Sequence, residues 1–276
     1  MKQILIIICS NTIKFFHTMW WLLYILIKTD RKNHIVYSDD RQLLNILANG
    51  PSLKEEIEKL DFGLEDFSVV NYFYRSPYFQ IIKPSIYVIV DPEFFEREDT
   101  YRPIIDHVTW PMKFVVPFFS WRKYAILRNM PNTYIEVVPI HCTTYSGYEC
   151  FRNWIYRHGF AMPKAQNVLV ASIFSAINMG YKEIKLYGVD HSWTKSLCVT
   201  EDNIVCAVDR HFYDTNQIKL EPYAKGLRGY YKLHELLRDF ANMFESYHSL
   251  RTYADNMGCK ILNKTKDSFI DAFERG

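Results

Sequence analysis

Short apolar runs rich in β-branched residues recur along the chain, and segments of helical or turn-forming composition separate them. The runs are Leu43–Ala48, Ser68–Asn71, Ile86–Val90, Lys113–Pro117, Ile135–Pro139, Ile184–Tyr187 and Lys260–Leu262. Continuous apolar strands that alternate with helices are typical of a parallel sheet covered on both faces. The pattern therefore predicts an α/β, doubly wound (Rossmann-like) and mostly parallel sheet, with an aromatic-rich insertion at about 92–160.

Two long helices are predicted from apolar positions that recur every 3.6 residues. The first is expected at about Lys164–Met179, and Gly180 supplies its stop signal. The second is expected over about Gly229–Met257 and ends at Gly258. Glycine after the last helical residue is the common way in which a helix terminates.

The first 28 residues form an apolar segment with two open interpretations. Polar residues interrupt its first half, and the uniformly apolar Phe15–Ile27 would reach only about 20 Å as a helix, short of a bilayer core. Interfacial aromatic and basic residues favour a membrane anchor; they are Trp20, Trp21, Tyr24, Lys28, Arg31 and Lys32. The alternative is an ordinary first strand at Gln3–Cys9 followed by a helix packed on the domain.

These patterns divide the chain into three parts. Residues 1–28 are the apolar segment, 29–42 are expected to be a polar linker, and 43–276 are expected to form the Rossmann-like domain. If the first segment inserts, its basic flank keeps the domain on the cytoplasmic face of the inner membrane, and otherwise the protein is cytoplasmic.

Composition excludes several classes of protein. With 49% hydrophobic residues the chain is too apolar for a disordered protein. A net charge of +2, without a dense basic stripe, gives no case for a nucleic-acid partner. Six scattered cysteines without a CxxC pair indicate reduced thiols and no zinc site.

The most informative local pattern is an apolar strand that runs into Asn49-Gly50-Pro51-Ser52. Ser52 and Glu55 have the spacing of a capping box at the start of a helix. That arrangement predicts free backbone N–H groups at the carboxyl end of a strand, where a phosphate would rest. The alternative is a plain strand–turn–helix without a ligand, since the turn is neither a P-loop nor a GxGxxG motif.

Two further strands also end on polar residues. Asn71 follows the second predicted strand and Asp91 follows the third. Because the carboxyl ends of parallel strands share one edge of a sheet, Asn49, Asn71 and Asp91 are expected to line one crevice. The base and ribose of a nucleotide would lie between Asn71 and Asp91.

Two polar clusters in the second half supply candidate catalytic groups. Asp190 and His191 follow the strand Ile184–Tyr187 and suit ribose binding or proton transfer, and His211 lies in the loop Asp209–Asp214. A structural role is the alternative for either histidine. His211 is preferred to His191 as the general base.

Several collinear motifs resemble bacterial lipooligosaccharide sialyltransferases. They are ANGPSL (48–53), FSVVNYFY (67–74), SIYVIVDPEFF (85–95) and NMGYKEIKLYGVDHSW (178–193). The chain also resembles the MptE-like group (6-hydroxymethylpterin diphosphokinase-like, DUF115), whose members occur in bacterial surface-polysaccharide clusters, through HFYD (211–214) and KILNKTKDSFIDAFER (260–275).

The sialyltransferase resemblance implies a glycosyltransferase that takes a nucleotide-sugar donor, CMP-linked in that family, and a glycan acceptor. It places donor contacts on Asn49, Gly50, Ser52 and Asn71, and it requires no metal cofactor. The chain departs from the family at Asp91, where the family has a second Asn, and it lacks the Tyr pair that steadies the leaving phosphate. His211 is the nearest counterpart of the catalytic histidine.

Two rival functions stay open. The MptE-like resemblance implies an Mg²⁺-dependent diphosphokinase, to which Asp91 and Asp190 would contribute carboxylates, although Val-Asp-Pro stands where an Asp-Leu-Asp pattern is expected. The other rival is a non-catalytic nucleotide-sugar-binding assembly protein. EDTA would inhibit the diphosphokinase and spare the glycosyltransferase, and turnover separates both from the assembly protein.

Overall fold

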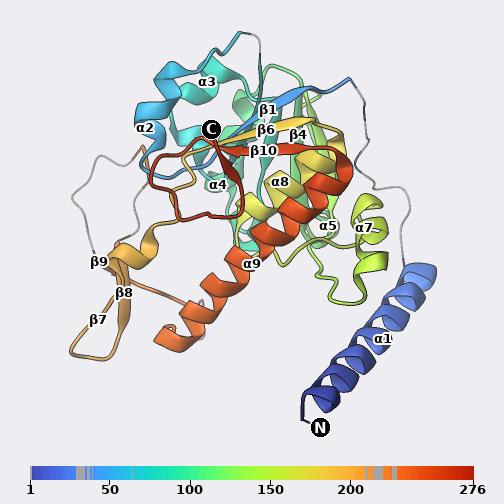
Figure 1. The fold of residues 1–276 in the computed structure, drawn as a ribbon. Coiled ribbons are helices and arrows are strands. Elements are labelled where there is room, and N and C mark those ends of the chain that lie inside the picture. Colours follow the sequence, from blue (N-terminus) through green and yellow to red (C-terminus); the bar gives the residue numbers. More distant parts are fainter. Residues whose placement is uncertain are drawn as a thin grey trace.

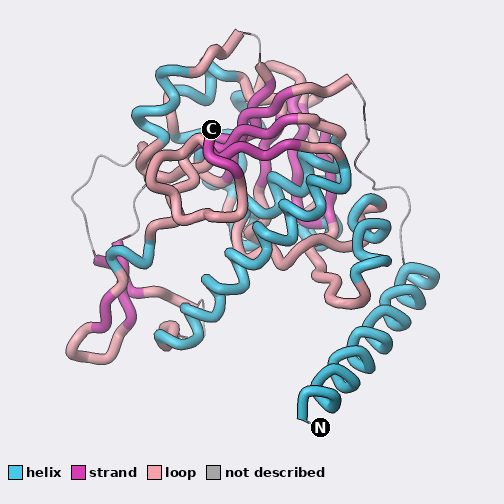
Figure 2. The backbone as a smooth tube through the Cα atoms, viewed as in Figure 1, coloured by secondary structure: helices cyan, strands magenta, loops and turns pink. Residues whose placement is uncertain are grey.

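The computed structural model describes residues 2–28, 35, 38, 40–63, 65–208, 211–213, 220–225 and 229–276. Eight parallel strands form the main sheet, in the order β11-β10-β6-β1-β2-β3-β4-β5 (Figures 1 and 2). They are β1 (Leu43–Leu47), β2 (Asp66–Val70), β3 (Ile86–Val88), β4 (Met112–Pro117), β5 (Ile135–Ile140), β6 (Glu183–Tyr187), β10 (Lys260–Asn263) and β11 (Glu274–Arg275). The prediction of a doubly wound, parallel α/β sheet is confirmed, and seven of these strands overlap the seven predicted runs.

Helices cover both faces of this sheet, because alternate strand residues point to opposite sides and both sides are apolar. Leu44 and Ile46 of β1 pack in the same buried cluster as α8 (Val168–Met179) and α9 (Leu233–Met257). Leu47 packs on the other face, with Leu53 and Ile104. The other helices are α2 (Leu53–Glu56), α3 (Tyr78–Ile82), α4 (Glu98–His107), α5 (Phe118–Lys123), α6 (Ala125–Arg128) and α7 (Glu149–Arg157).

The two long helices begin later than predicted and end where predicted. The Oδ1 atom of Asn167 accepts a hydrogen bond from the backbone N–H of Val170, which caps α8 and sets its start. Gly180 and Gly258 end α8 and α9 in the left-handed conformation, with φ of 97° and 68°. Glycine is favoured at both positions because it has no Cβ to strain this backbone.

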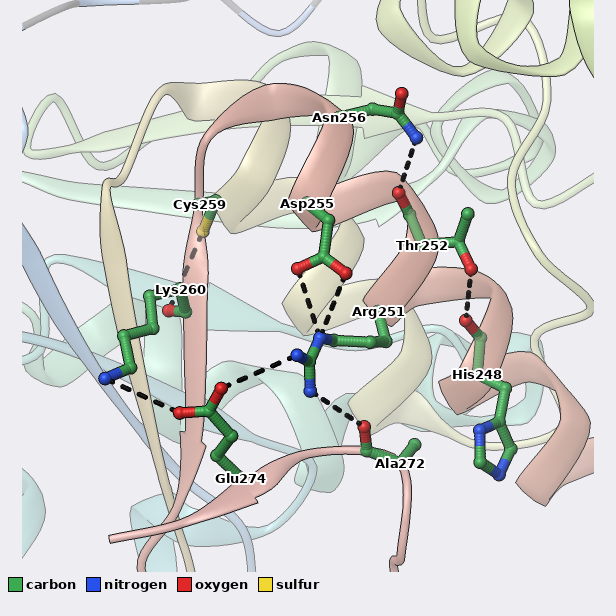
Figure 3. A network of polar contacts seen from close by, with 9 residues as sticks. All are labelled: His248, Arg251, Thr252, Asp255, Asn256, Cys259, Lys260, Ala272 and Glu274. Atoms are coloured by element: carbon green, nitrogen blue, oxygen red, sulfur yellow. Dashed lines mark hydrogen bonds and ion pairs between the residues drawn. The ribbon is translucent and has the colours of Figure 1, made fainter.

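The end of α9 is fastened to β10 and β11 by a polar network (Figure 3). Arg251 binds Asp255 on its own helix at 3.1 Å and Glu274 of β11 at 3.5 Å. Lys260 of β10 also binds Glu274, again at 3.5 Å. The two-residue strand β11, which was not predicted, is therefore held by side chains as well as by its pairing with β10.

Two predictions about organisation need correction, and one feature was not predicted. Residues 92–160 are not a separate insertion, because they contribute β4 and β5 to the main sheet. The segment outside the main sheet is instead a small antiparallel sheet of β7 (Cys198–Val199), β8 (Val205–Val208) and β9 (Leu220–Pro222), which was not predicted. The interpretation of Gln3–Cys9 as a first strand is wrong, because α1 (Lys2–Lys28) is helical throughout.

Some predictions fall on residues outside the described ranges. Most of the linker 29–42, including Arg31 and Lys32, lies outside them, and so do Asp209, Arg210 and Asp214 beside His211. The six cysteines are free thiols. Within the residues that the structure describes, no helix has the length and hydropathy required to cross a membrane.

Candidate functional site

The site lies where the chain order of the sheet reverses. Strands β1 and β6 are neighbours, yet the chain continues from β1 toward β5 and from β6 toward β11. Their ends stay in register beyond the strands, since the N–H of Ala48 donates to Tyr187 O and the N–H of Gly50 donates to Gly188 O, both at 2.9 Å. In open α/β sheets, ligands bind at the carboxyl edge at such a reversal.

A cavity of about 790 Å³ opens at this edge, within the range of small-molecule sites. Every predicted site residue except Ser52 lines it: Asn49, Gly50, Pro51, Asn71, Asp91, Asp190, His191 and His211. The expectation that three consecutive strands present polar residues to one crevice therefore agrees with the geometry.

Asn49 is the most buried polar residue among these strand-end positions, with 9% of its surface exposed. Its Nδ2 atom donates to the carbonyl of Val70 at the end of β2, at 3.2 Å, and this bond fixes the orientation of the amide. Its Oδ1 atom is buried and has no hydrogen-bond partner. A buried acceptor without a donor costs about 1–3 kcal/mol, so a ligand donor supplied through the cavity would recover that free energy.

The turn after Asn49 does not form the predicted phosphate cradle. Its N–H groups are already paired, since that of Gly50 donates to Gly188 O, that of Leu53 to Gly50 O and that of Ser52 to Asp190 Oδ1. The capping box is also absent: Ser52 is helical, makes no cap, and donates through its hydroxyl to Asp190 Oδ2 at 2.8 Å. The carboxylate of Asp190 thus occupies the place predicted for the phosphate.

Gly50 is required by close packing. A Cβ at this position would lie 2.0 Å from Asp190 Oδ2 and 2.4 Å from Gly188 O. The left-handed backbone that would also have explained this glycine is not observed, because Gly50 is not among the residues with positive φ. The short distance to Gly188 is what lets the β1 and β6 turns sit against each other.

Asn71 and Asp91 complete the sheet side of the cavity. Asn71 has a left-handed backbone with φ of 49°, which asparagine tolerates better than most residues, and its carbonyl accepts a hydrogen bond from Tyr87. Asp91 is exposed and accepts the N–H of Glu93 at 3.0 Å, which caps a short 3₁₀ helix at Pro92–Phe95. One Asp91 oxygen is therefore committed to the backbone.

The turn that carries Asp190 is held in place by Glu56 of α2 and by the C-terminal segment. The carboxylate of Glu56 accepts the N–H of Gly188 at 2.9 Å, and burial, together with the nearby charge of Asp190, raises the pKa of Glu56. The hydroxyl of Thr265 accepts the N–H of Val189, and the carbonyl of Asp190 accepts the N–H of Phe269. The ending KILNKTKDSF (260–269) therefore positions Asp190.

His191 is buried and held by two donors. Asn167 Nδ2, which can only donate, lies 3.0 Å from His191 Nε2, so this ring nitrogen is the acceptor. The Tyr247 hydroxyl accepts from Asn167 Nδ2 at 2.8 Å and donates to the same ring nitrogen at 2.6 Å. Burial lowers the pKa of His191 to about 3. With its acceptor nitrogen occupied and its basicity low, His191 is poorly suited to remove a proton at neutral pH.

His211 reaches the cavity from a different segment, which is anchored by its neighbour. Phe212 is buried, packs on Phe73 with ring centroids 5.5 Å apart, and donates its N–H to Asn49 O at 3.1 Å. The bond from Phe212 to Asn49 places His211 next to the Asn49 turn, where it lines the cavity. Because His191 is poorly suited to the task, His211 stays the preferred candidate for the base.

The opposite wall of the cavity is aromatic and apolar. Trp193 stacks on Phe240 of α9, with ring centroids 5.9 Å apart and planes inclined by 21°. Asp239, beside Phe240, accepts hydrogen bonds from Gln166 and Tyr231. Further lining residues are Val168 and Leu169 of α8, Leu236 and Met243 of α9, Val208 of β8, Tyr223 directly after β9, and Lys195 of the 3₁₀ helix Trp193–Ser196.

Sequence reasoning missed most of this wall. Asn167 carried a signal, since an asparagine directly before the apolar run VLV is typical of an N-cap. The sequence gives no local signal for Tyr247 and Phe240, because both belong to the apolar stripe of α9 and tertiary packing sets their partners.

The carboxylates of Asp190 and Asp91 both accept hydrogen bonds from the protein. Asp190 accepts from Ser52, and one oxygen of Asp91 caps Pro92–Phe95. Within the described part of the chain no three His, Cys, Asp or Glu side chains lie close enough together to hold a metal ion.

Comparison with known proteins reveals a likeness of fold. No family model matches the chain, and no curated protein matches it. Among solved structures, the MAf glycosyltransferase of Magnetospirillum magneticum AMB-1 superposes with a TM-score of 0.50 at 14% identity, over 88% of this chain and 35% of that one.

Two Campylobacter jejuni enzymes superpose with TM-scores below 0.5. Sialyltransferase CstII, solved with cytidine-5'-monophosphate, gives a TM-score of 0.46 at 17% identity, over 85% of this chain and 84% of that one. An α-2,3-sialyltransferase in its apo form gives 0.47 at 16% identity, over 89% and 84% of the two chains.

Proposed function

We propose that this chain is a nucleotide-sugar-dependent glycosyltransferase. The observation that carries the proposal is the meeting of Asn49, Asn71, Asp91 and Asp190 around one cavity at the reversal point of the sheet. Polar strand ends at this place are the usual recognition groups for a nucleotide in an open α/β sheet. The motif resemblance to lipooligosaccharide sialyltransferases, with their CMP-linked donors, supports the same class.

The sheet side of the cavity suits the hydroxyl and amino groups of the donor. Asn49 Oδ1 lacks a hydrogen-bond donor, and Asp190 presents a carboxylate beside it. Both accept hydrogen bonds, so a ribose hydroxyl or the amino group of a base fits here, whereas a phosphate would meet a like charge. Nucleoside recognition is therefore assigned to the residues first expected to hold the phosphate.

The phosphate is better placed at the start of α8. Asn167, Val168 and Leu169 line the cavity, and α8 has twelve residues whose dipoles point their positive end there. Lys195 lines the same cavity and adds a full positive charge. These groups would stabilise the nucleotide phosphate as it leaves, in place of the Tyr pair that the sialyltransferase motif would supply.

The aromatic wall suits the acceptor. An apolar ring face flanked by hydrogen-bonding groups matches a sugar, which has C–H faces and hydroxyl edges. Trp193 on Phe240 provides the face, and Asp239 provides a carboxylate at its edge. In the reaction, the acceptor oxygen bonds to the anomeric carbon, the bond from that carbon to the phosphate oxygen breaks, and His211 takes the acceptor proton.

The finer assignments extend this proposal. A glycan acceptor in bacterial surface-polysaccharide synthesis follows from the sequence resemblance, and the cytoplasmic face of the inner membrane follows if residues 1–28 associate with it. The Mg²⁺-dependent MptE-like diphosphokinase ranks second, because Val90-Asp91-Pro92 stands where its Asp-Leu-Asp pattern is expected. The non-catalytic assembly protein would share the cavity and lack turnover.

A thermal-shift screen tests the proposal. CMP-, UDP- and GDP-sugars and ATP are added to the wild-type chain and to Asn49→Ala, and the best ligand is then assayed for transfer with and without EDTA. We expect a nucleotide sugar to raise the midpoint temperature of thermal unfolding, and we expect a smaller rise for Asn49→Ala. Transfer should continue in the presence of EDTA. ATP as the best ligand with EDTA-sensitive turnover would establish the diphosphokinase, and binding without turnover would establish the assembly protein.

A further inference from the structure

Helix α1 has two apolar faces, and only one of them meets the rest of the protein. On the inner face, Thr18 and Trp21 are almost fully buried, with 3% and 2% of their surfaces exposed. The rings of Trp21 and Tyr145 meet edge-on at 6.2 Å. A soluble surface helix needs only one such face, because a single apolar stripe suffices to pack it on a core.

Hydrogen bonds hold the inner face on the segment that precedes α7. The hydroxyls of Thr18 and Tyr145 lie 2.9 Å apart, and Thr18 also accepts the N–H of Tyr148 at 3.0 Å. The hydroxyl of Tyr148 donates to the carbonyl of Asn11. A Cβ on Gly147 would lie 2.3 Å from the Thr18 hydroxyl, so the contact depends on the absence of a side chain there.

The outer face is a continuous stripe of large apolar side chains. Their exposed fractions are Ile13 69%, Phe16 66%, Met19 49%, Trp20 55%, Leu23 55%, Leu26 76% and Ile27 68%. At about 100° per residue these positions span about 140° of the helix, wider than an ordinary core-facing stripe. Lys14 and His17 are half-buried and lie on the inner side, so the stripe from Ile13 to Ile27 carries no charge.

An apolar surface of this extent marks an interaction site. Its residue types and charges identify the partner. Trp20 and Tyr24 stack with ring centroids 5.3 Å apart, and these amphipathic rings favour the boundary between lipid headgroups and acyl chains. The helix contains three lysines and no acidic residue, and Arg31 and Lys32 follow it in the sequence. Two such helices placed together would repel, whereas an anionic bilayer surface attracts them.

We propose that the outer face of α1 docks on an anionic lipid surface, with the helix lying in the plane of the interface. The inner face stays on the protein, because its hydrogen bonds to Tyr145 and Tyr148 would be lost in hydrocarbon. Figure 1 shows α1 at the periphery, extending away from the main sheet on the side of α7. The inference does not rest on the proposed reaction.

Vesicle flotation of the full chain tests it. Vesicles of phosphatidylcholine alone and vesicles that also contain phosphatidylglycerol are compared at low and high salt. The test variant carries Phe16→Ser, Trp20→Ser and Leu23→Ser. The matched control carries Ile81→Ser, Phe119→Ser and Tyr134→Ser, three apolar side chains that are at least half exposed and lie on other elements.

The wild type and the control are expected to float with the anionic vesicles, and more weakly at high salt. The test variant should partition at least about tenfold more weakly, because membrane affinity scales with buried apolar area. The effect of salt on wild-type flotation tests the proposal without any variant, so it remains informative even if the test variant misfolds. Absence of wild-type flotation would overturn the inference, as would equal flotation of the test variant. A wild-type dimer that forms without vesicles, and that the test variant does not form, would also overturn it. The outer face of α1 would then contact a second copy of the chain.

Discussion

The two walls of the cavity differ in how they are built. The sheet wall consists of residues that directly follow β1, β2, β3 and β6, whose positions are set by backbone pairing. The opposite wall consists of side chains from α8, α9, the 3₁₀ helix Trp193–Ser196 and the small antiparallel sheet, whose positions are set by packing. The first wall offers hydrogen-bond acceptors, and the second offers an aromatic face.

Under the proposed function, each wall has a separate task. The sheet wall would bind the nucleoside of the donor, and the opposite wall would bind the acceptor and the donor phosphate. Changes on the sheet wall should therefore alter donor affinity, changes at the aromatic face of Trp193 and Phe240 should alter acceptor affinity, and a change at His211 should alter the rate. The predictions below test that division, beginning with the largest expected effect.

Gly50→Ala should destabilise the fold by about 3 kcal/mol, since overpacking typically costs about 1–3 kcal/mol and here the obstacle is backbone. The added Cβ would overlap Gly188 O and the Asp190 carboxylate. Urea denaturation measures the loss. Gly63→Ala is the control, because its nearest heavy atom would be a side-chain oxygen at 3.4 Å. Equal stability of the two variants would disprove the close approach of the β1 and β6 turns.

His211→Ala should lower the transfer rate by about 10²-fold, or about 2.7 kcal/mol in the activation barrier, with donor affinity unchanged. Single-turnover transfer and donor titration separate these quantities. His107→Ala provides a control, since His107 is at the end of α4 and does not line the cavity. A loss of donor affinity with a normal rate would make His211 a binding residue instead of the base.

His191 should make the fold sensitive to acid. Its pKa falls from 6.5 to about 3 on folding, so the unfolded chain binds a proton that the folded chain does not. Stability is therefore complete above pH 6.5 and declines as the pH falls toward 3, by about 2 kcal/mol at pH 5. His191→Gln, which can still accept from Tyr247, should show a smaller decline between pH 8 and pH 5. Parallel pH profiles would show that His191 is not held neutral.

Trp193→Ala should raise KM for the acceptor by about tenfold, as expected for the loss of one aromatic contact, and leave donor affinity unchanged. Trp193→Phe keeps an aromatic ring at this position, so its KM for the acceptor should stay close to that of the wild type. Trp154→Ala is a matched control, because that side chain is 45% exposed on α7 and lies outside the cavity. A weakened donor with a normal acceptor KM would reverse the assignment of the two walls.

The same division explains what the sequence could predict. Apolar runs mark the strands, and a parallel sheet places their carboxyl ends at one edge, so the sequence alone groups Asn49, Asn71, Asp91 and Asp190. Gly180 and Gly258 likewise mark their helix ends. These features depend on local pattern and on the regularity of the sheet.

The remaining features depend on contacts between distant segments. The phosphate cradle failed because Asp190, 138 residues away, takes the N–H of Ser52. The low pKa of His191 follows from burial against Tyr247, and Trp193 meets Phe240 only because α9 crosses the cavity. A single sequence carries no local sign of these pairings.

Donor titration of the wild type, Asn49→Ala and Asn256→Ala tests the central claim most directly. Asn256 is an exposed asparagine on the last turn of α9, outside the cavity lining, and serves as the control. Calorimetry should show that Asn49→Ala weakens nucleotide-sugar binding by about tenfold, because one buried hydrogen bond is lost, while Asn256→Ala binds like the wild type. Equal affinity of all three folded proteins would contradict a nucleotide site at the carboxyl edge of this sheet.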